Sequence, residues 1–157
     1  MPPRTLFDLS ALDLNKAAYD QEFIRTVNPQ RGEMEHLDAI VYVDGSKGDI
    51  LGYKDVQENE FWVPGHIPGR PLLPGVIMIE SAAQLCSFYT KVVLKLPGFI
   101  GFGGVEDCKF RAQVLPGSRM YLLGHLEWHR HGRVCSSVQG LVNGTVAFDA
   151  TIIGVQM

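Results

Sequence analysis

The sequence predicts an α+β domain in which a curved antiparallel sheet of about six strands wraps around one long, central, apolar helix. Three observations lead to this fold class: a long apolar stretch after residue 74, about six β-rich segments joined mostly by tight turns, and no linker or internal repeat. A sheet that must cover an apolar helix curls around it, because both elements bury their hydrophobic faces against each other. The 157 residues are enough for one such domain.

The chain opens with a short extension. Asp13 is suited to cap a helix over residues 14–27, and this helix must stop before Pro29 because the residue preceding a proline resists the helical conformation. We therefore expect residues 1–28 to form an N-terminal extension with one short helix, and residues 29–157 to form a single domain.

The central helix is expected over residues 75–96, and Pro97 with Gly98 ends it. Its residues are apolar nearly all round, which is typical of a helix that is buried on most sides. Polar residues such as Glu80 and Lys91 interrupt the stretch, whereas a membrane span needs about 20 mostly apolar residues. We expect a buried helix and no membrane partner.

Runs rich in β-branched and aromatic residues mark the strands. They are expected at residues 39–43, 49–56, 105–114, 119–129, 133–142 and 145–154. Between the last two, Asn143-Gly144 is a strong hairpin signal, because both residue types tolerate the positive φ angles of a two-residue turn.

The composition limits the possible partners and location. The net charge of −3 argues against a nucleic-acid partner, since such proteins usually carry a basic excess. The three cysteines are widely spaced without a CxxC pair, and the N-terminus lacks a basic region followed by an apolar run. We therefore expect a reducing compartment, the cytoplasm.

A proline-rich loop over residues 61–74 carries the first candidate catalytic residue, His66. Four prolines exclude a regular helix or an inner strand here and stiffen the backbone. A rigid support is what a catalytic group needs. The alternative is an ordinary loop histidine with one satisfied hydrogen bond.

Two further candidates follow, at the start of the apolar helix and within it. Glu80 has apolar helical neighbours, where a carboxylate is costly to bury, so it is either functional or reaches solvent or an arginine. Gly75 is either a flexible residue or a site where a ligand carbonyl approaches the unpaired first amides of the helix. A histidine base, a carboxylic acid and an amide donor are what is needed to remove a proton beside a carbonyl and expel a hydroxyl.

At these residues the chain resembles the FabZ/FabA-type 3-hydroxyacyl-acyl-carrier-protein dehydratases. Residues 59–84 read NEFWVPGHIPGRPLLPGVIMIESAAQ, which is similar without a gap to the family signature NEPFFxGHFPxxPxMPGVLxxEAxAQ. Residues 28–40 (NPQRGEMEHLDAI) and 109–117 (KFRAQVLPG) are similar to two further family segments, so that the resemblance covers the chain from about Val27 onward. It implies the hot-dog fold.

The resemblance also implies roles and partners. His66 would abstract the α-proton, Glu80 would assist departure of the β-hydroxyl as water, and the Gly75 amide would bind the thioester carbonyl. No cofactor and no metal are expected, because an acyl carrier protein, or coenzyme A, presents the acyl group on its phosphopantetheine arm. A homodimer with shared sites is implied, which in this family often assembles further into a trimer of dimers. For the substrate tunnel along the dimer interface we nominate Phe99, Ile100 and Phe102.

The chain departs from the family at a few positions. Gln30 replaces a histidine, residues 32–35 replace an aromatic-apolar run, and Ile67 replaces a phenylalanine. These changes affect the expected packing near the site entrance rather than His66 and Glu80. Because the acid is glutamate rather than aspartate, the FabZ-like branch is favoured, which dehydrates without isomerising the double bond.

Other interpretations remain open at this point. Glu80 and Gly75 would also serve a hot-dog acyl thioesterase, although hydrolysis does not need the histidine loop, and a non-catalytic acyl-binding subunit is the third candidate. Four polar side chains at alternate positions could share one face of a strand: His125, Glu127, His129 and His131. They would form either a metal-binding site or, as we favour, the ordinary polar face of an amphipathic strand. Five basic residues offer either a carrier-protein patch or a solvated surface: Lys109, Arg111, Arg119, Arg130 and Arg133.

Overall fold

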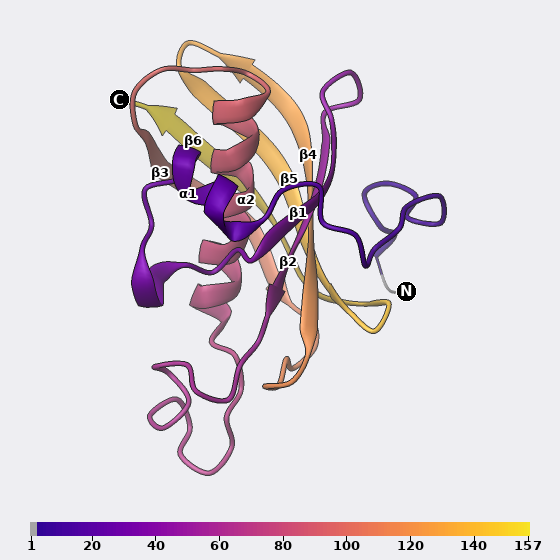
Figure 1. Ribbon diagram of the computed structural model, residues 1–157, viewed down its shortest axis with the longest axis vertical. Coiled ribbons are helices and arrows are strands. Elements are labelled where there is room, and N and C mark those ends of the chain that lie inside the picture. The colour runs from indigo at the N-terminus through magenta and orange to yellow at the C-terminus, as the bar shows by residue number, and fades with distance from the viewer. Residues whose placement is uncertain (1–2) are drawn as a thin grey trace.

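The computed structural model describes residues 3–157, and it shows one helix embraced by one curved sheet (Figure 1). All neighbouring strands are antiparallel, in the order β1-β2-β4-β5-β6-β3. The elements are α1 (Gln21–Val27), β1 (Ala39–Asp44), β2 (Asp49–Asp55), α2 (Gly75–Val92), β3 (Ile100–Phe110), β4 (Arg119–Arg130), β5 (Arg133–Val142) and β6 (Thr145–Gln156). The α+β prediction is confirmed, with six strands.

Helix α2 lies against the concave face of the sheet and forms the main core (Figure 1). Leu85 and Phe88 are fully buried, and Tyr89 is nearly so, which confirms the prediction of a helix buried on most sides. Burying each such side chain contributes about 1.5–3 kcal/mol, so this one element provides much of the hydrophobic stabilisation. Within residues 3–157, no helix is long and apolar enough to cross a membrane.

Two hairpin turns follow the sequence signals closely. Asn143 and Gly144 have φ angles of 51° and 76°, and His131 and Gly132 have φ angles of 51° and 71°. Two successive positive φ angles match the right-handed twist of the strands they connect. These turns fix the register of β4, β5 and β6, whose bounds lie within two residues of those expected.

The opening helix is shorter than predicted. We expected Asp13 to cap a helix over 14–27, but α1 begins at Gln21 and is capped by Asp20, whose carboxylate accepts a hydrogen bond of 2.9 Å from the amide three residues on. The residues just before it instead pair with β1, where two consecutive amides donate to the Ile40 carbonyl. Pairing with the sheet edge outweighs the helix propensity of this segment.

The central helix also ends earlier than predicted, at Val92 rather than at residue 96. Lys95 has a φ of 56°, a left-handed conformation that a continuing helix excludes. The Lys91 ammonium donates to the carbonyls of Leu96 and Gly98 at 3.1 and 2.6 Å, so that it satisfies backbone groups of the turn that replaces the last helical residues.

The strand predicted at 105–114 is displaced toward the N-terminus. β3 runs from Ile100 to Phe110 at the edge of the sheet, and it pairs with β6 through two irregularities, one beside Gly103 and one between Glu106 and Lys109. Glycines weaken a strand signal, so the sequence did not show where this strand begins. Bulges are common on edge strands, because only one neighbour holds them.

The N-terminal segment covers the outer face of the sheet. A second hydrophobic cluster centres on Leu51, Leu123 and Leu141, and side chains of the opening residues pack against it, namely Leu6, Phe7, Leu9, Leu12 and Leu14. The side-chain carboxamide of Gln139, on β5, holds this segment with two hydrogen bonds. Its oxygen accepts from the Leu6 amide at 2.9 Å, and its nitrogen donates to the Arg4 carbonyl at 2.7 Å. The extension is therefore part of the packed fold.

Candidate active site

The segment from Phe61 to Pro74 forms a loop that projects beyond one end of the sheet (Figure 1). Trp62 is buried and holds its base, because the Trp62 carbonyl accepts hydrogen bonds from the amides of Gly65 and His66. At the other end the Leu73 amide donates to Val114, beyond β3. The loop is thus tied to the body of the protein on both sides of His66.

His66 is held in one ring orientation. Its Nδ1 lies 2.7 Å from the Leu72 carbonyl oxygen. A carbonyl only accepts hydrogen bonds, so Nδ1 carries the proton, and in the neutral ring Nε2 is left with a free lone pair. The next residue, Ile67, has a φ of 56°, which is strained for a β-branched side chain. His66 is therefore held with Nε2 free of protein hydrogen bonds, on a strained and well-anchored loop.

A buried polar cluster supports the start of this loop. The Glu60 carboxylate accepts from Lys54 at 2.8 Å, from the Trp62 indole at 3.1 Å and from the Gln57 amide at 2.8 Å. Burial acts to raise the pKa of Glu60, but these bonds outweigh it and hold the pKa below its usual value. Breaking such a pair by removing one partner typically costs about 3–5 kcal/mol, so the pair is a firm base for the loop.

His36 completes the cluster as a neutral residue. It is 1% exposed, and its Nδ1 lies 3.3 Å from the Lys54 ammonium. Burial, with the nearby Lys54 charge, lowers the pKa of His36 to about 4. Nothing in the sequence pattern indicated this cluster, because it joins residues of β2, the loop and the segment before β1.

We expect His36→Leu to weaken the acid sensitivity of the fold. Because the pKa of His36 in the folded protein lies below the usual 6.5, His36 of the unfolded chain becomes protonated at a higher pH than His36 of the folded protein. The wild type therefore keeps its full stability above about pH 6.5 and loses up to about 1.4 kcal/mol per pH unit from this group between pH 6.5 and 4. Urea unfolding at pH 7.5 and 5.0 measures the difference, and equal losses in both proteins would contradict it.

Gly75 begins α2 directly after Pro74, which offers no side-chain cap. The first amides of the helix point outward with a partial positive charge. A Cβ at position 75 would lie 2.7 Å from ring atoms of Phe110, so another residue would fit only if that ring moved. This close approach is a packing reason for glycine here, because the Phe110 ring lies against the start of α2.

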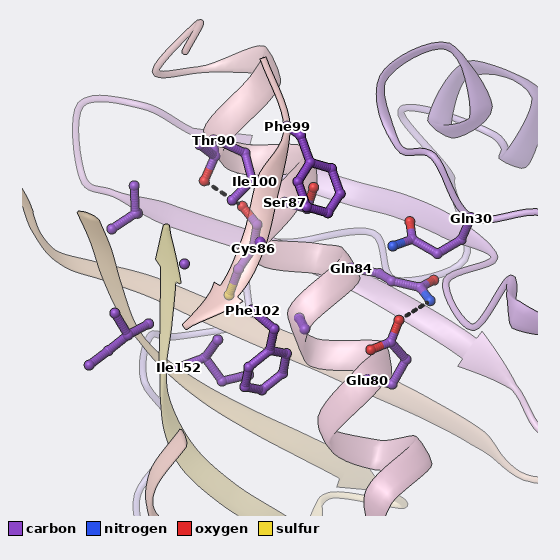
Figure 2. A pocket seen from close by; sticks show the side chains of 15 residues that line it. Gln30, Glu80, Gln84, Cys86, Ser87, Thr90, Phe99, Ile100, Phe102 and Ile152 are labelled. Carbon is purple, nitrogen blue, oxygen red and sulfur yellow. Dashed lines mark hydrogen bonds between the residues drawn. The ribbon is translucent and has the colours of Figure 1, made fainter. Parts of the chain in front are cut away.

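Glu80 lies on the face of α2 that lines a pocket (Figure 2). Its Oε1 accepts a hydrogen bond of 3.0 Å from the Gln84 carboxamide, which also donates to the Met34 carbonyl at 2.7 Å. The Gln84 oxygen accepts from the His36 amide at 2.9 Å. Gln84 is buried and fully used, so it fixes the Glu80 carboxylate. Its spacing of four residues from Glu80 was the available signal for this role.

The pocket has a volume of about 160 Å³ and brings together four of the residues nominated from the sequence. Phe99, Ile100 and Phe102 line it together with Glu80, beside residues of α2, β5 and β6 (Figure 2). His66 and Gly75 are not among its lining residues. Within one chain the structure thus joins Glu80 to the nominated tunnel residues, and it leaves His66 on its separate loop.

The side chains of β4 that were considered as metal ligands have other hydrogen-bond partners or are out of alignment. His125 Nδ1 lies 2.7 Å from the carboxylate of the buried Asp49, and Glu127 accepts from Ser137 at 2.7 Å. A bulge between Leu126 and Trp128 breaks the alternation that would align the histidines. Among residues 3–157 there is no group of three or more histidine, cysteine or acidic side chains that could hold a metal ion.

Two of the five basic residues considered for a carrier patch are paired with carboxylates. Arg111 contacts Asp149 at 2.6 Å, and Arg119 contacts Asp55 at 2.7 Å. Exposed pairs of this kind contribute at most about 1 kcal/mol. Their charge is partly neutralised, so any attraction for an acidic partner depends more on the other basic residues.

Comparison with known proteins extends these observations. Residues 28–151 match the family model of the FabA-like domain. The chain is 33% identical to a 3-hydroxyacyl-[acyl-carrier-protein] dehydratase FabZ from Desulfotalea psychrophila, with 80% of this chain and 85% of the relative covered. It is 32% identical to the FabZ of Bacillus pumilus, with 85% and 92% covered.

Solved structures share the architecture at lower identity. A chain of the dehydratase heterocomplex ApeI:P from Xenorhabdus doucetiae aligns with a TM-score of 0.69 at 16% identity, over 85% of this chain and 90% of that one. A sigma28-regulated virulence protein from Campylobacter jejuni aligns with a TM-score of 0.68 at 17% identity, over 93% and 96%. At these identities the likeness shows the fold alone, and it agrees with the predicted hot-dog arrangement.

Proposed function

This chain belongs to the family of FabA-like domains, and on that premise we propose that it catalyses the reversible dehydration of (3R)-hydroxyacyl thioesters to trans-2-enoyl thioesters. The observation that supports this most is the position of Glu80, a carboxylate fixed by Gln84 at a pocket whose opposite wall is apolar. The curated relatives are named for the same reaction on acyl carrier protein.

The proposed chemistry divides between three groups. His66 Nε2, left unprotonated by the Leu72 hydrogen bond, removes the proton from C2. The Gly75 amide donates to the thioester oxygen as negative charge develops there, which is worth about 3 kcal/mol for one well-placed donor. Glu80 gives a proton to the 3-hydroxyl, the C3–O bond breaks, water leaves and the C2–C3 double bond forms. The reverse path adds water.

The same proposal includes the assembly. In a two-fold dimer, His66 of one subunit would serve Glu80 of the other, which accounts for the absence of His66 from the pocket lining within residues 3–157. β3 is an edge strand, and Phe99, Phe102 and Phe110 on or beside it are about half exposed, so this edge offers an apolar surface for a partner copy. A trimer of such dimers is compatible with this arrangement.

We propose no cofactor and no metal, because the acid, the base and the amide are all supplied by the chain. The acyl group would arrive on the phosphopantetheine arm of an acyl carrier protein or as a coenzyme A thioester. The three cysteines are free, which is compatible with a reducing cytoplasm.

The test is to incubate the purified protein with a 3-hydroxyacyl thioester and to follow enoyl thioester by absorbance and all products by mass spectrometry. Reversible formation of enoyl thioester supports the dehydratase. Free acid without enoyl product would assign the site to a thioesterase, for which Glu80 would activate water. No turnover over several chain lengths on both carriers would favour an acyl-binding subunit.

A further inference from the structure

Most polar groups that line the Glu80 pocket are already hydrogen-bonded to protein, but two are not. The Gln84 carboxamide is fully used, and Thr90 donates to the Cys86 carbonyl at 2.9 Å. Among residues 3–157, the side chains of Gln30 and Ser87 form no hydrogen bond, and the Gln30 oxygen Oε1 is buried without a partner. An acceptor buried without a partner is costly, so the Gln30 oxygen keeps hydrogen-bonding capacity for a ligand.

The backbone that carries Gln30 is fixed against α2. The Asn28 carboxamide donates to the Gln84 carbonyl at 2.9 Å. The Arg31 guanidinium donates to the carbonyls of Asn28 and Gln30 at 2.9 and 2.7 Å, and to Arg25 at 2.9 Å. Figure 2 shows the Gln30 carboxamide reaching into the pocket between Gln84 and Phe99. This position therefore belongs to the built wall of the pocket.

Gln30 and Ser87 lie beyond Glu80 along the pocket. The α2 residues that line it run from Glu80 to Thr90, and at 1.5 Å per residue Ser87 stands about 10 Å along the helix from Glu80. The Asn28 side chain, two residues before Gln30, donates a hydrogen bond to the Gln84 carbonyl, so Gln30 lies beside the same stretch of α2. An acyl chain with its 3-hydroxyl at Glu80 that follows the pocket passes both polar side chains after C3.

The opposite wall of the pocket is apolar. It is formed by side chains of β3, β5 and β6, among them Ile100, Phe102, Val134 and Ile152. A substrate chain in this pocket would therefore contact hydrocarbon on one side and unpaired hydrogen-bonding groups on the other. A plain alkyl chain matches only the apolar side, and it would leave the Gln30 oxygen buried without a partner.

Building on the proposed dehydratase function, we propose that the preferred substrate carries a second hydroxyl group on the acyl chain beyond C3, and that Gln30 with Ser87 binds it. The unpaired Gln30 oxygen is able to accept a hydrogen bond from a hydroxyl, whereas a keto group has no proton to donate, and the serine hydroxyl both donates and accepts. A site built to hydrogen-bond a substrate oxygen discriminates strongly against the analogue that lacks it.

The test compares two 3-hydroxyacyl thioesters of equal chain length, one with a plain alkyl chain and one with a hydroxyl at C9. In an extended chain C9 lies about 8 Å beyond C3, level with the stretch of α2 between Gln84 and Ser87, which is about 6–10 Å from Glu80. For the wild type we expect kcat/KM to be about tenfold higher with the C9 hydroxyl, as expected for one or two hydrogen bonds. Gln30→Leu should remove or reverse this preference, and Ser87→Ala should reduce it. Gln113→Leu, the same change at an exposed position outside the pocket, should keep it.

Each other result has a defined meaning. Equal or better turnover of the alkyl substrate, unchanged in Gln30→Leu, would overturn the inference while leaving the dehydratase function intact. Unchanged selectivity with a smaller native mass for Gln30→Leu would also overturn it, because the carboxamide would then bind the partner subunit. No enoyl product from either substrate, where the carrier is accepted, would overturn both proposals.

Discussion

His66→Ala is expected to lower kcat for enoyl formation by about 10²–10⁴-fold while leaving the fold intact. The imidazole is half-buried on a loop held at both ends, and its Nδ1 is committed to the Leu72 carbonyl, so only Nε2 is available as a base. Alanine removes that lone pair and leaves the backbone ties of the loop in place. Steady-state kinetics with a saturating 3-hydroxyacyl thioester measures the loss.

Two controls make this result specific. His129→Ala changes an exposed histidine on β4 and should keep wild-type turnover. Circular dichroism and native mass spectrometry of His66→Ala should match the wild type, which separates loss of the base from loss of structure. Full activity in a correctly folded His66→Ala protein would remove His66 from the mechanism.

Glu80→Gln should cause a loss of similar size, because it removes the ionisable proton and keeps the volume. A glutamine oxygen at this position is still able to accept from Gln84, so the geometry of the pocket is preserved. The limb of the pH-rate profile that belongs to the acid should disappear with the carboxyl group. Glu58→Gln, at an exposed position, is the matched control. A pH-rate profile identical to the wild type would show that Glu80 is not the acid.

Mixing the two inactive variants tests whether sites are shared between subunits. In a two-fold dimer with His66 and Glu80 from different chains, a heterodimer of the two variants contains one intact site and one doubly altered site. Random pairing after co-expression should then restore about a quarter of wild-type activity. If both groups come from one chain, every site carries one defect and no activity returns.

The sequence predicted those parts of the structure that depend on local rules. Asn143-Gly144 predicted the last hairpin because both residues adopt positive φ angles, and the apolar stretch predicted α2 because the helix is buried against both the sheet and α1. Glu80 and the nominated tunnel residues proved to share one pocket. Glu80 was predicted from the motif on α2, and the tunnel residues were predicted because they directly follow the helix.

The remaining features depend on contacts between distant parts of the chain. The predicted start of α1 was wrong because the Ile40 carbonyl, on β1, accepts hydrogen bonds from the amides of Ala18 and Tyr19, which a longer helix would have used. The Lys54–Glu60 pair with His36, and the hydrogen bonds that hold Gln84 to Met34 and His36, also require residues that only the tertiary fold brings together. Local propensity carries no information on such pairings. It is also least reliable for edge strands such as β3, which have only one neighbouring strand.

The docking of the N-terminal segment on the outer face has a consequence for the order of events during synthesis. Residues 4–14 are synthesised more than 120 residues before partners such as Gln139 and Leu141 on β5. Their leucines therefore have no native cluster to join until β5 has been made and paired. Docking of this segment on the outer face consequently depends on the sheet, and it does not precede the sheet.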